Sequence, residues 1–217
     1  MRYFPSWVES EYYKVGNERA VELAYYQDTF NVMFAGNIGE AQDFPAILGA
    51  AEAARDISDL RWFIIGSGRA LDWVRQEISV RRLQDRVVLL GRHPTERMPS
   101  FFRAADALLV SLKKEPVFSM TVPGKLQNYL ASGVPVLAML DGEGARVVNE
   151  SGGGLTSPAG DGFALAQSVR QLKAMTEVDR RAMGRRGQDY CRREFGRDIL
   201  MSRLEGWMAE VSRSTAG

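Results

Sequence analysis

The segment Thr121–Met139, Thr-Val-Pro-Gly-Lys-Leu-Gln-Asn-Tyr-Leu-Ala-Ser-Gly-Val-Pro-Val-Leu-Ala-Met, decides the fold class. Its Pro-Gly pair sets an entry turn and places Lys125 in or beside the first turn of a helix. Leu126 and Tyr129 recur at helical spacing and begin a buried stripe, before a glycine ends the helix. Unpaired N–H groups at a helix start favour an anion such as a diphosphate. A solvated lysine on a structural helix explains these residues equally well.

Apolar strands alternate with amphipathic helices along most of the chain. The apolar runs predict strands at 31–36, 60–65, 87–90, 107–111, 134–138 and 155–158. Helical periodicity predicts helices at 43–55, 71–82, 98–105, 125–132, 145–149, 162–172 and 195–211, with others in the arginine-rich region 180–193. This alternation predicts an α/β fold with a Rossmann-like, doubly wound parallel sheet and a C-terminal helix.

The candidate binding residues follow the predicted strands or open the helix after them. Right-handed crossovers place all such loops at one edge of the sheet. Glycines let a backbone approach a ligand closely, and cations and amides bind phosphate or ribose. The candidates are Gly36, Asn37, Gly39, Gly66, Gly68, Arg92, Gly124, Lys125 and Asn128.

Other polar residues near this edge are given structural or solvent roles. His93 is expected to be a surface or hydrogen-bonded loop residue, and Lys113 and Lys114 are expected to form a solvated loop. The Gly-x-Gly at 66–68 lacks the third glycine of a dinucleotide fingerprint, and no acidic residue closes the next strand. A nicotinamide cofactor is therefore not predicted.

Composition limits the function classes further. The 217 residues include 45% hydrophobic and 25% charged residues, with 28 basic and 27 acidic residues and a net charge of +1. This balance argues against nucleic acid as a partner. A single cysteine, Cys191, excludes an internal disulfide, and a single histidine argues against a histidine-based metal site. No apolar run reaches the roughly 20 residues of a membrane span. We expect a cytoplasmic chain with no metal or cofactor.

The run Pro-Gly-Lys-Leu-Gln-Asn-Tyr-Leu-Ala-Ser-Gly-Val-Pro-Val (123–136) resembles the signature of the retaining GT-B glycosyltransferases of family 4. Within that family, the run is most similar to the bacterial branch that builds surface polysaccharide and lipopolysaccharide. The motif of that branch is Pro-Ser-Lys-Leu-x-x-Tyr-Leu-Ala-x-Gly-x-Pro-Val. Pro-Ser-Trp-Val-Glu at 5–9 and Ala-Ala-Asp at 104–106 add to the resemblance, which covers roughly residues 31–210. It implies the nucleotide-sugar-binding half of a GT-B enzyme, with Arg92 as a base or phosphate contact.

The chain departs from that family at the residues that carry chemistry. The family's two glutamates, separated by seven residues, correspond to Met120 and Asn128, so the catalytic residues are unknown. Glu115 is a speculative replacement. Where many members carry an arginine and a lysine after the first strand, this chain has Glu-Ala-Gln-Asp at 40–43. Lys125, Arg92 or backbone amides must then meet the phosphate charge.

The resemblance implies a division into a linker arm at 1–28, a nucleotide-sugar-binding domain at 29–195 and a helix at 196–213. The acceptor domain of a GT-B enzyme has no room in this length, so we expect a fragment that is inactive alone. The parent would transfer sugar from a UDP-linked donor to a glycan or lipid-linked acceptor, with possible contact at the inner face of the membrane.

Two alternatives stay open. The missing carboxylates fit a non-catalytic nucleotide-binding or scaffolding module. An epimerase of the same architecture is weaker, because it would need acids and histidines that this segment does not offer.

Overall fold

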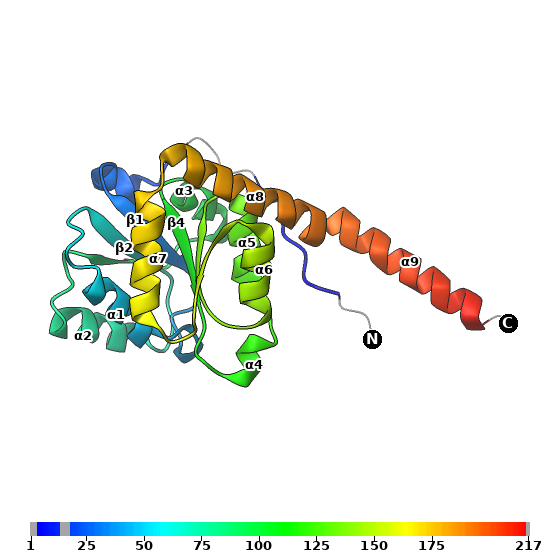
Figure 1. Ribbon diagram of the computed structural model, residues 1–217, viewed down its shortest axis with the longest axis horizontal. Coiled ribbons are helices and arrows are strands. Elements are labelled where there is room, and N and C mark those ends of the chain that lie inside the picture. Colours follow the sequence, from blue (N-terminus) through cyan, green and yellow to red (C-terminus); the bar gives the residue numbers. More distant parts are fainter. Residues whose placement is uncertain (1–3, 14–17, 216–217) are drawn as a thin grey trace.

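The computed structural model describes residues 4–13 and 18–215, which form one parallel sheet with helices on both faces (Figure 1). The strands are β1 (Phe30–Ala35), β2 (Leu60–Ile65), β3 (Val87–Gly91), β4 (Ala107–Ser111), β5 (Val136–Met139) and β6 (Gly154–Ser157). Their order is β3-β2-β1-β4-β5-β6, and every pair is parallel. The predicted doubly wound fold is confirmed. The order reverses direction between β1 and β4, which makes that point the topological switch.

The connecting helices occupy nearly all the predicted positions. The α-helices are α1 (Phe44–Ala53), α2 (Leu71–Val80), α3 (Met98–Phe102), α4 (Pro116–Ser119), α5 (Gly124–Ser132), α6 (Glu143–Ser151), α7 (Gly162–Ala174), α8 (Glu177–Phe195) and α9 (Arg197–Thr215). Short 3₁₀ helices are η1 (Ser10–Tyr13), η2 (Val21–Tyr26), η3 (Glu40–Gln42) and η4 (Thr95–Arg97). Gly133 ends α5 in the left-handed conformation, as the sequence predicts.

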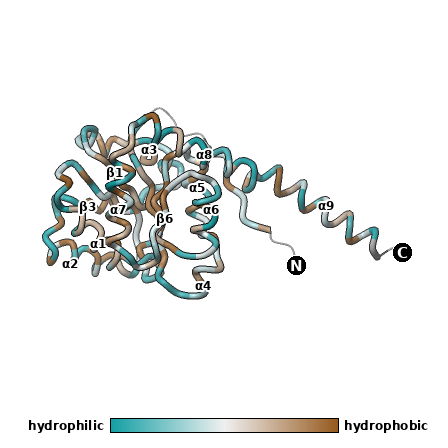
Figure 2. The backbone as a smooth tube through the Cα atoms, viewed as in Figure 1, coloured by the Kyte–Doolittle hydropathy of each residue, from teal (hydrophilic) through white to brown (hydrophobic). Residues whose placement is uncertain are grey.

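Alternate strand residues point to opposite faces and build two cores. On β1, Val32 and Phe34 join the core made with α1, α2 and α7, whereas Met33 and Ala35 join the core made with α3, α5, α6 and α8. Figure 2 shows the hydrophobic residues concentrated in the sheet, while α8 is mostly hydrophilic. Both faces of each inner strand are therefore buried, which explains why these strands read as continuous apolar runs.

Several element boundaries differ from the prediction by a few residues, as in α3, which ends at Phe102 instead of residue 105. The fifth strand begins at Val136 instead of Val134, because Gly133 still caps α5 and Pro135 has no N–H to donate to a ladder. Pro135 contributes only its carbonyl, which accepts from the Leu108 N–H at 2.9 Å. Helix α6 extends beyond the predicted 145–149 at both ends, to Glu143 and Ser151.

The N-terminal arm lies on the α3/α5 face and then follows the C-terminal helix. Val8 is buried, and its N–H donates to the Phe195 carbonyl at 3.2 Å. Phe4 contacts Trp207 edge-on, with ring centroids 6.2 Å apart. Figure 1 shows α9 extending away from the sheet beside this arm. Residues 1–3 and 14–17 of the predicted arm lie outside the described residues.

The switch point is held open by a tyrosine. Strands β1 and β4 pair only through Val32 with Ala107 and Met33 with Leu108. Beyond them, the buried Tyr129 hydroxyl accepts from the Ala35 N–H and donates to the Ala35 carbonyl, each at 2.9 Å. The Tyr129 side chain, which extends from α5, thus takes the place of a strand partner for Ala35. It separates β1 from β4 at their carboxyl ends.

We predict that Tyr129→Phe lowers the free energy of unfolding by about 1–3 kcal/mol, because it leaves two buried backbone groups of Ala35 without their partner. Urea denaturation measures the change. Tyr25→Phe is the matched control, because Tyr25 is 96% exposed and should tolerate loss of its hydroxyl. Equal stability of the Tyr129→Phe protein and the unmodified protein would contradict this account.

Candidate functional site

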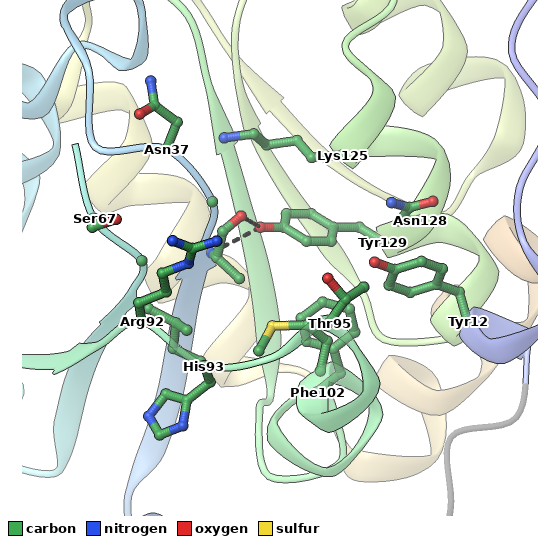
Figure 3. A pocket seen from close by; sticks show the side chains of 15 residues that line it. Tyr12, Asn37, Ser67, Arg92, His93, Thr95, Phe102, Lys125, Asn128 and Tyr129 are labelled. Carbon is green, nitrogen blue, oxygen red and sulfur yellow. Dashed lines mark hydrogen bonds between the residues drawn. The ribbon is translucent and has the colours of Figure 1, made fainter.

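A cavity of about 440 Å³ opens at the carboxyl edge of the sheet, beside the switch point (Figure 3). It is bounded by the ends of β1, β2 and β3 and by α3, α5 and η1. The residues that line it are Tyr12, Ala35, Gly36, Asn37, Ile65, Gly66, Ser67, Arg92, His93, Thr95, Met98, Phe102, Lys125, Asn128 and Tyr129. The lining contains a lysine and an arginine and no carboxylate, so the cavity favours an anion.

The loops after β1 and β2 lie against each other at the floor of this cavity. The Gly36 N–H donates to the Ile65 carbonyl at 2.9 Å, and the Gly66 N–H donates to the Gly91 carbonyl at 2.7 Å. Gly66 has φ +137°, and a Cβ there would lie 1.9 Å from the Gly36 carbonyl oxygen. Only glycine fits this conformation and this distance. The close approach lets three post-strand loops share one site.

Lys125 reaches the cavity from the first turn of α5. Its ammonium donates to the Gln42 side-chain oxygen at 2.6 Å and lies 4.1 Å from the centroid of the Phe34 ring. A Cβ at Gly36 would be 3.2 Å from the same nitrogen. Burial lowers the pKa of Lys125 to about 8, because the charged form loses solvation. No carboxylate in the described part of the chain forms an ion pair with it.

The loop after β3 brings Arg92 and His93 to the opposite side. His93 Nε2 lies 3.0 Å from the Leu90 carbonyl oxygen, in agreement with the predicted hydrogen-bonded role. Arg97 forms a two-pronged pair with Glu22, at 2.6 and 2.9 Å, and this hydrogen bonding lowers the pKa of Glu22 to about 2. The pair ties the loop to η2 and so fixes one wall of the cavity.

Aromatic rings form the remaining wall. Tyr12 stacks on Phe102 with centroids 6.2 Å apart, and Phe102 meets the Tyr129 ring edge-on at 5.4 Å. Burial raises the pKa of Tyr12, so its hydroxyl stays protonated. Figure 3 shows Asn37, Lys125 and Asn128 toward one end of the cavity and His93 and Phe102 toward the other. An end with a lysine and two amides therefore faces an end where Arg92 and His93 lie beside apolar and aromatic side chains.

The structure gathers most, but not all, of the predicted binding residues. Those that line the cavity are Gly36, Asn37, Gly66, Arg92, Lys125 and Asn128. Those outside its lining are Gly39, Gly68 and Gly124. Gly68 supports the loop instead, since a Cβ there would meet the Ile38 carbonyl oxygen at 2.3 Å. Gly39 lines a separate cavity with Arg69 and Trp73, and Gly124 begins α5.

Several lining residues carry no sequence signal of a site role. Tyr12 and Thr95 come from irregular segments whose spacing carries no periodic signal. Met98 and Phe102 have the spacing of an ordinary helical core face, and Tyr129 belongs to the predicted buried stripe of α5. Only the tertiary arrangement distinguishes these residues from ordinary core or loop residues.

The positions that correspond to the family's two glutamates have different surroundings. Asn128 lines the cavity, whereas Met120 is 71% exposed beyond α4. Glu115, the speculative replacement, precedes α4 and is not among the lining residues. The cavity therefore offers an amide where the resemblance implies an acid.

The described residues contain no cluster of three or more histidine, cysteine, aspartate or glutamate side chains placed to hold a metal ion. Across residues 4–13 and 18–215, no helix is long and apolar enough to cross a bilayer.

Comparison with known proteins identifies the family. The model of the family described as "Glycosyl transferases group 1" matches residues 29–174, which is more than half of the chain. The chain belongs to the group 1 glycosyltransferases. The match begins at the residue before β1 and ends with α7, so this glycosyltransferase domain includes the whole sheet and every lining residue of the cavity except Tyr12.

Two curated glycosyltransferases are similar in sequence. "Probable glycosyltransferase WbjE" of Pseudomonas aeruginosa is 27% identical over 190 residues, covering 84% of this chain and 45% of the relative. The 2-deoxystreptamine N-acetyl-D-glucosaminyltransferase of Streptomyces fradiae is 24% identical over 176 residues, covering 81% and 40%. The chain thus spans less than half the length of these two relatives.

Solved structures share the GT-B half-fold. Anabaena HepE, crystallised with UDP and glucose, has a TM-score of 0.73 at 15% identity and covers 93% of this chain and 52% of its own. Sucrose-phosphate synthase of Thermosynechococcus elongatus has a TM-score of 0.78 at 19% identity, covering 98% and 53%. The C-terminal domain of LpcC from Francisella tularensis has a TM-score of 0.63 at 17% identity, covering 80% and 92%.

We predict that Gly66→Ala lowers the free energy of unfolding by about 1–3 kcal/mol, because a Cβ would be strained at φ +137° and would overlap the Gly36 carbonyl. Thermal and urea unfolding measure the loss. Gly49→Ala within α1 is the control, since no atom lies within 4 Å of its Cβ position, and we expect a gain of about 0.5–1 kcal/mol. Similar effects of the two substitutions would refute the close-approach argument.

We predict that Lys125→Met raises the free energy of unfolding at pH 7 by about 1–3 kcal/mol, because the variant has no partly buried ammonium whose loss of solvation opposes folding. The lysine pKa is about 8 in the fold against a model value of 10.5, so the unfolded chain holds the proton more tightly. The contribution of Lys125 to the free energy of unfolding of the unmodified protein should therefore increase as pH rises from about 8 to 10.5. The variant has no lysine at this position and should not show that increase.

Urea unfolding of both proteins across this range isolates the lysine, because every other group is common to both. A stability difference that stays constant with pH would show that Lys125 has an ordinary pKa.

Proposed function

We propose that this chain is the donor-binding domain of a retaining glycosyltransferase that uses a UDP-linked sugar. The parent enzyme would act in bacterial surface-polysaccharide or lipopolysaccharide synthesis, on a glycan or lipid-linked acceptor. In this proposal the acceptor is held by a further domain, and the enzyme works in the cytoplasm at the inner face of the membrane. No metal or organic cofactor takes part.

One observation carries the proposal: the cavity at the switch point holds Lys125 and Arg92 and has no carboxylate in its lining. Ligands of open α/β sheets bind at this crevice. The volume of about 440 Å³ is in the range of small-molecule sites. A nucleoside diphosphate matches both the charge of one end and the flat, aromatic surface of the other.

The two ends of the cavity give the donor a direction. The diphosphate would lie at the Lys125 end, close to the Gly36 backbone and the first-turn N–H groups of α5. The base would lie toward Arg92, His93 and Phe102, which line the cavity from the post-β3 loop and α3. Asn128 could bond a ribose or sugar hydroxyl as donor and acceptor.

The same groups account for a catalytic contribution of the domain. Transfer leaves negative charge on the departing nucleoside diphosphate. A fixed ammonium and helix N-terminal N–H groups stabilise that charge as it develops, without reorganisation at the moment of reaction. This step requires no acid from the cavity, which agrees with the absence of a carboxylate from the lining.

Relatives support the nucleotide assignment. The Anabaena HepE structures contain UDP, and one also contains glucose. Pneumococcal GtfA was solved with UDP and GlcNAc, at a TM-score of 0.66 and 18% identity. These ligands belong to those proteins, and their similarity to this chain makes UDP the first nucleotide to test.

A non-catalytic nucleotide-binding module is the second candidate. It is favoured by Asn128 and Met120 at the positions where the family resemblance implies glutamates. The protein that contains this chain, incubated with UDP-sugars and lipid-linked acceptors, separates the two. Release of UDP supports the transferase, whereas UDP binding with neither transfer nor hydrolysis supports the module.

We predict that the chain binds UDP in calorimetric titration more tightly than GDP or ADP, and that Lys125→Ala weakens UDP binding about 10- to 100-fold by removing a charged hydrogen-bond donor. Lys114→Ala is the matched control, because Lys114 is exposed and outside the cavity lining. Equal affinity of the Lys125→Ala protein, or no binding of UDP by the unmodified chain, would argue against the proposed site.

A further inference from the structure

The ammonium of Lys125 is held by a single polar contact. It donates one hydrogen bond to Gln42 Oε1 at 2.6 Å. An ammonium has three N–H donors, so two of them have no protein partner among the described residues. The nitrogen stands beside Gly36, where a side chain would crowd it. The lysine is therefore fixed on one side and free to donate on the other.

Gln42 is itself fixed by the end of β4. The buried Ser111 hydroxyl donates to the Gln42 carbonyl at 2.6 Å, and the Lys113 N–H donates to the Ala41 carbonyl at 2.9 Å. Within η3, the Gln42 N–H donates to the Gly39 carbonyl at 3.2 Å. These three bonds hold the backbone of residues 40–43, the segment that lacks a cation. They direct the side-chain amide of Gln42 toward Lys125.

The Phe34 ring holds the ammonium from another side. Phe34 is fully buried and packs edge-on against Phe44 with centroids 5.2 Å apart, so its ring has a fixed orientation. The lysine nitrogen lies 4.1 Å from its centroid, within the range of a cation–π contact. Both contacts are with neutral groups, so they position the ammonium and leave its charge intact.

We infer that Gln42 is a positioning residue that holds the Lys125 ammonium for the donor diphosphate. A carboxylate at this place would reach the same nitrogen but would cancel its charge, and an apolar side chain would leave it unanchored. The inference rests on the proposed function, because it assigns the anchored ammonium to the diphosphate of a nucleotide sugar.

Other charged or titratable groups face the same region. Arg92 and His93 face the cavity from the post-β3 loop, Tyr12 from η1 and Tyr129 from α5. The remaining ones flank Gln42 in sequence or follow β4, namely Glu40, Asp43 and Lys113. All of them are unchanged in the variants compared below, so differences between those variants report on Gln42 and Lys125.

The test compares Gln42→Glu and Gln42→Leu with the unmodified chain in UDP titrations between pH 7.5 and 10. The diphosphate of UDP keeps a constant charge in this range, because the second ionisation of a phosphate has a pKa of about 6. Deprotonation of the uracil ring near the upper end of the range is common to every variant, so it cancels when the variants are compared. At pH 7.5 we expect UDP affinity to fall about 10-fold or more in both variants.

The midpoint pH at which UDP affinity is lost should shift in opposite directions in the two variants. A carboxylate near an ammonium favours the charged lysine, so Gln42→Glu should raise the midpoint by about one unit or more. Gln42→Leu removes a hydrogen-bond acceptor and should lower it. Gln76→Glu is the charge-matched control, because Gln76 is exposed on α2 and outside the cavity lining.

A purely structural role would leave the midpoint unchanged in every variant. A double-mutant cycle with the neutral variant gives the second readout, since in a Lys125→Ala background Gln42→Leu should cause no further loss of UDP affinity. Additive losses, or one common midpoint, would overturn the inference.

A ligand-free measurement separates this inference from the proposed function. The rate at which a small amine-reactive ester labels Lys125, followed by peptide mass spectrometry across pH, reports the same midpoint without UDP. If the midpoint pH of labelling shifts in the variants but UDP does not bind, Gln42 still positions Lys125, and the proposal that the site binds UDP is wrong. UDP binding with unshifted labelling would retain the nucleotide and overturn the role of Gln42.

Discussion

The hydroxyl of Tyr129 is the contact on which the architecture of the site depends. It satisfies both backbone groups of Ala35 and so allows β1 to end without a β4 partner. A buried strand end with unpaired groups would be costly. With the tyrosine in place, the sheet separates at its switch point, and α5 is fixed to the end of β1. That attachment brings the first turn of α5, with Lys125, to the cavity.

The electrostatics of the cavity follow from what surrounds this lysine. Its neighbours are an amide, an aromatic ring and a glycine, all neutral, and burial weakens its hold on a proton. Elsewhere on this protein, arginines pair with carboxylates, as Arg97 does with Glu22. An ion pair at the lysine would give a more stable empty site and a weaker attraction for an anion.

The sequence predicts the sheet well because its inner strands are buried on both faces and read as unbroken apolar runs. It also predicts the edge at which Gly36, Gly66 and Lys125 meet, since parallel strands put their following loops together. Gly39 and Gly68 lie outside the cavity lining, and a glycine that accommodates a neighbouring loop, as Gly68 does with Ile38, has the same sequence pattern as one that accommodates a ligand. Contacts between distant residues leave no local pattern, and Gln42 and Lys125 are separated by 83 positions.

The lowered pKa of Lys125 has a thermodynamic consequence for any anion that enters the cavity. Near pH 8 the empty site is a mixture of ammonium and neutral amine. A bound anion favours the ammonium, so occupation draws a fraction of a proton from the solvent. The heat of binding then includes the ionisation enthalpy of the buffer that supplies this proton. The slope of the binding heat plotted against the ionisation enthalpy of the buffer gives the number of protons taken up. This measurement reports the protonation of the lysine without altering the protein.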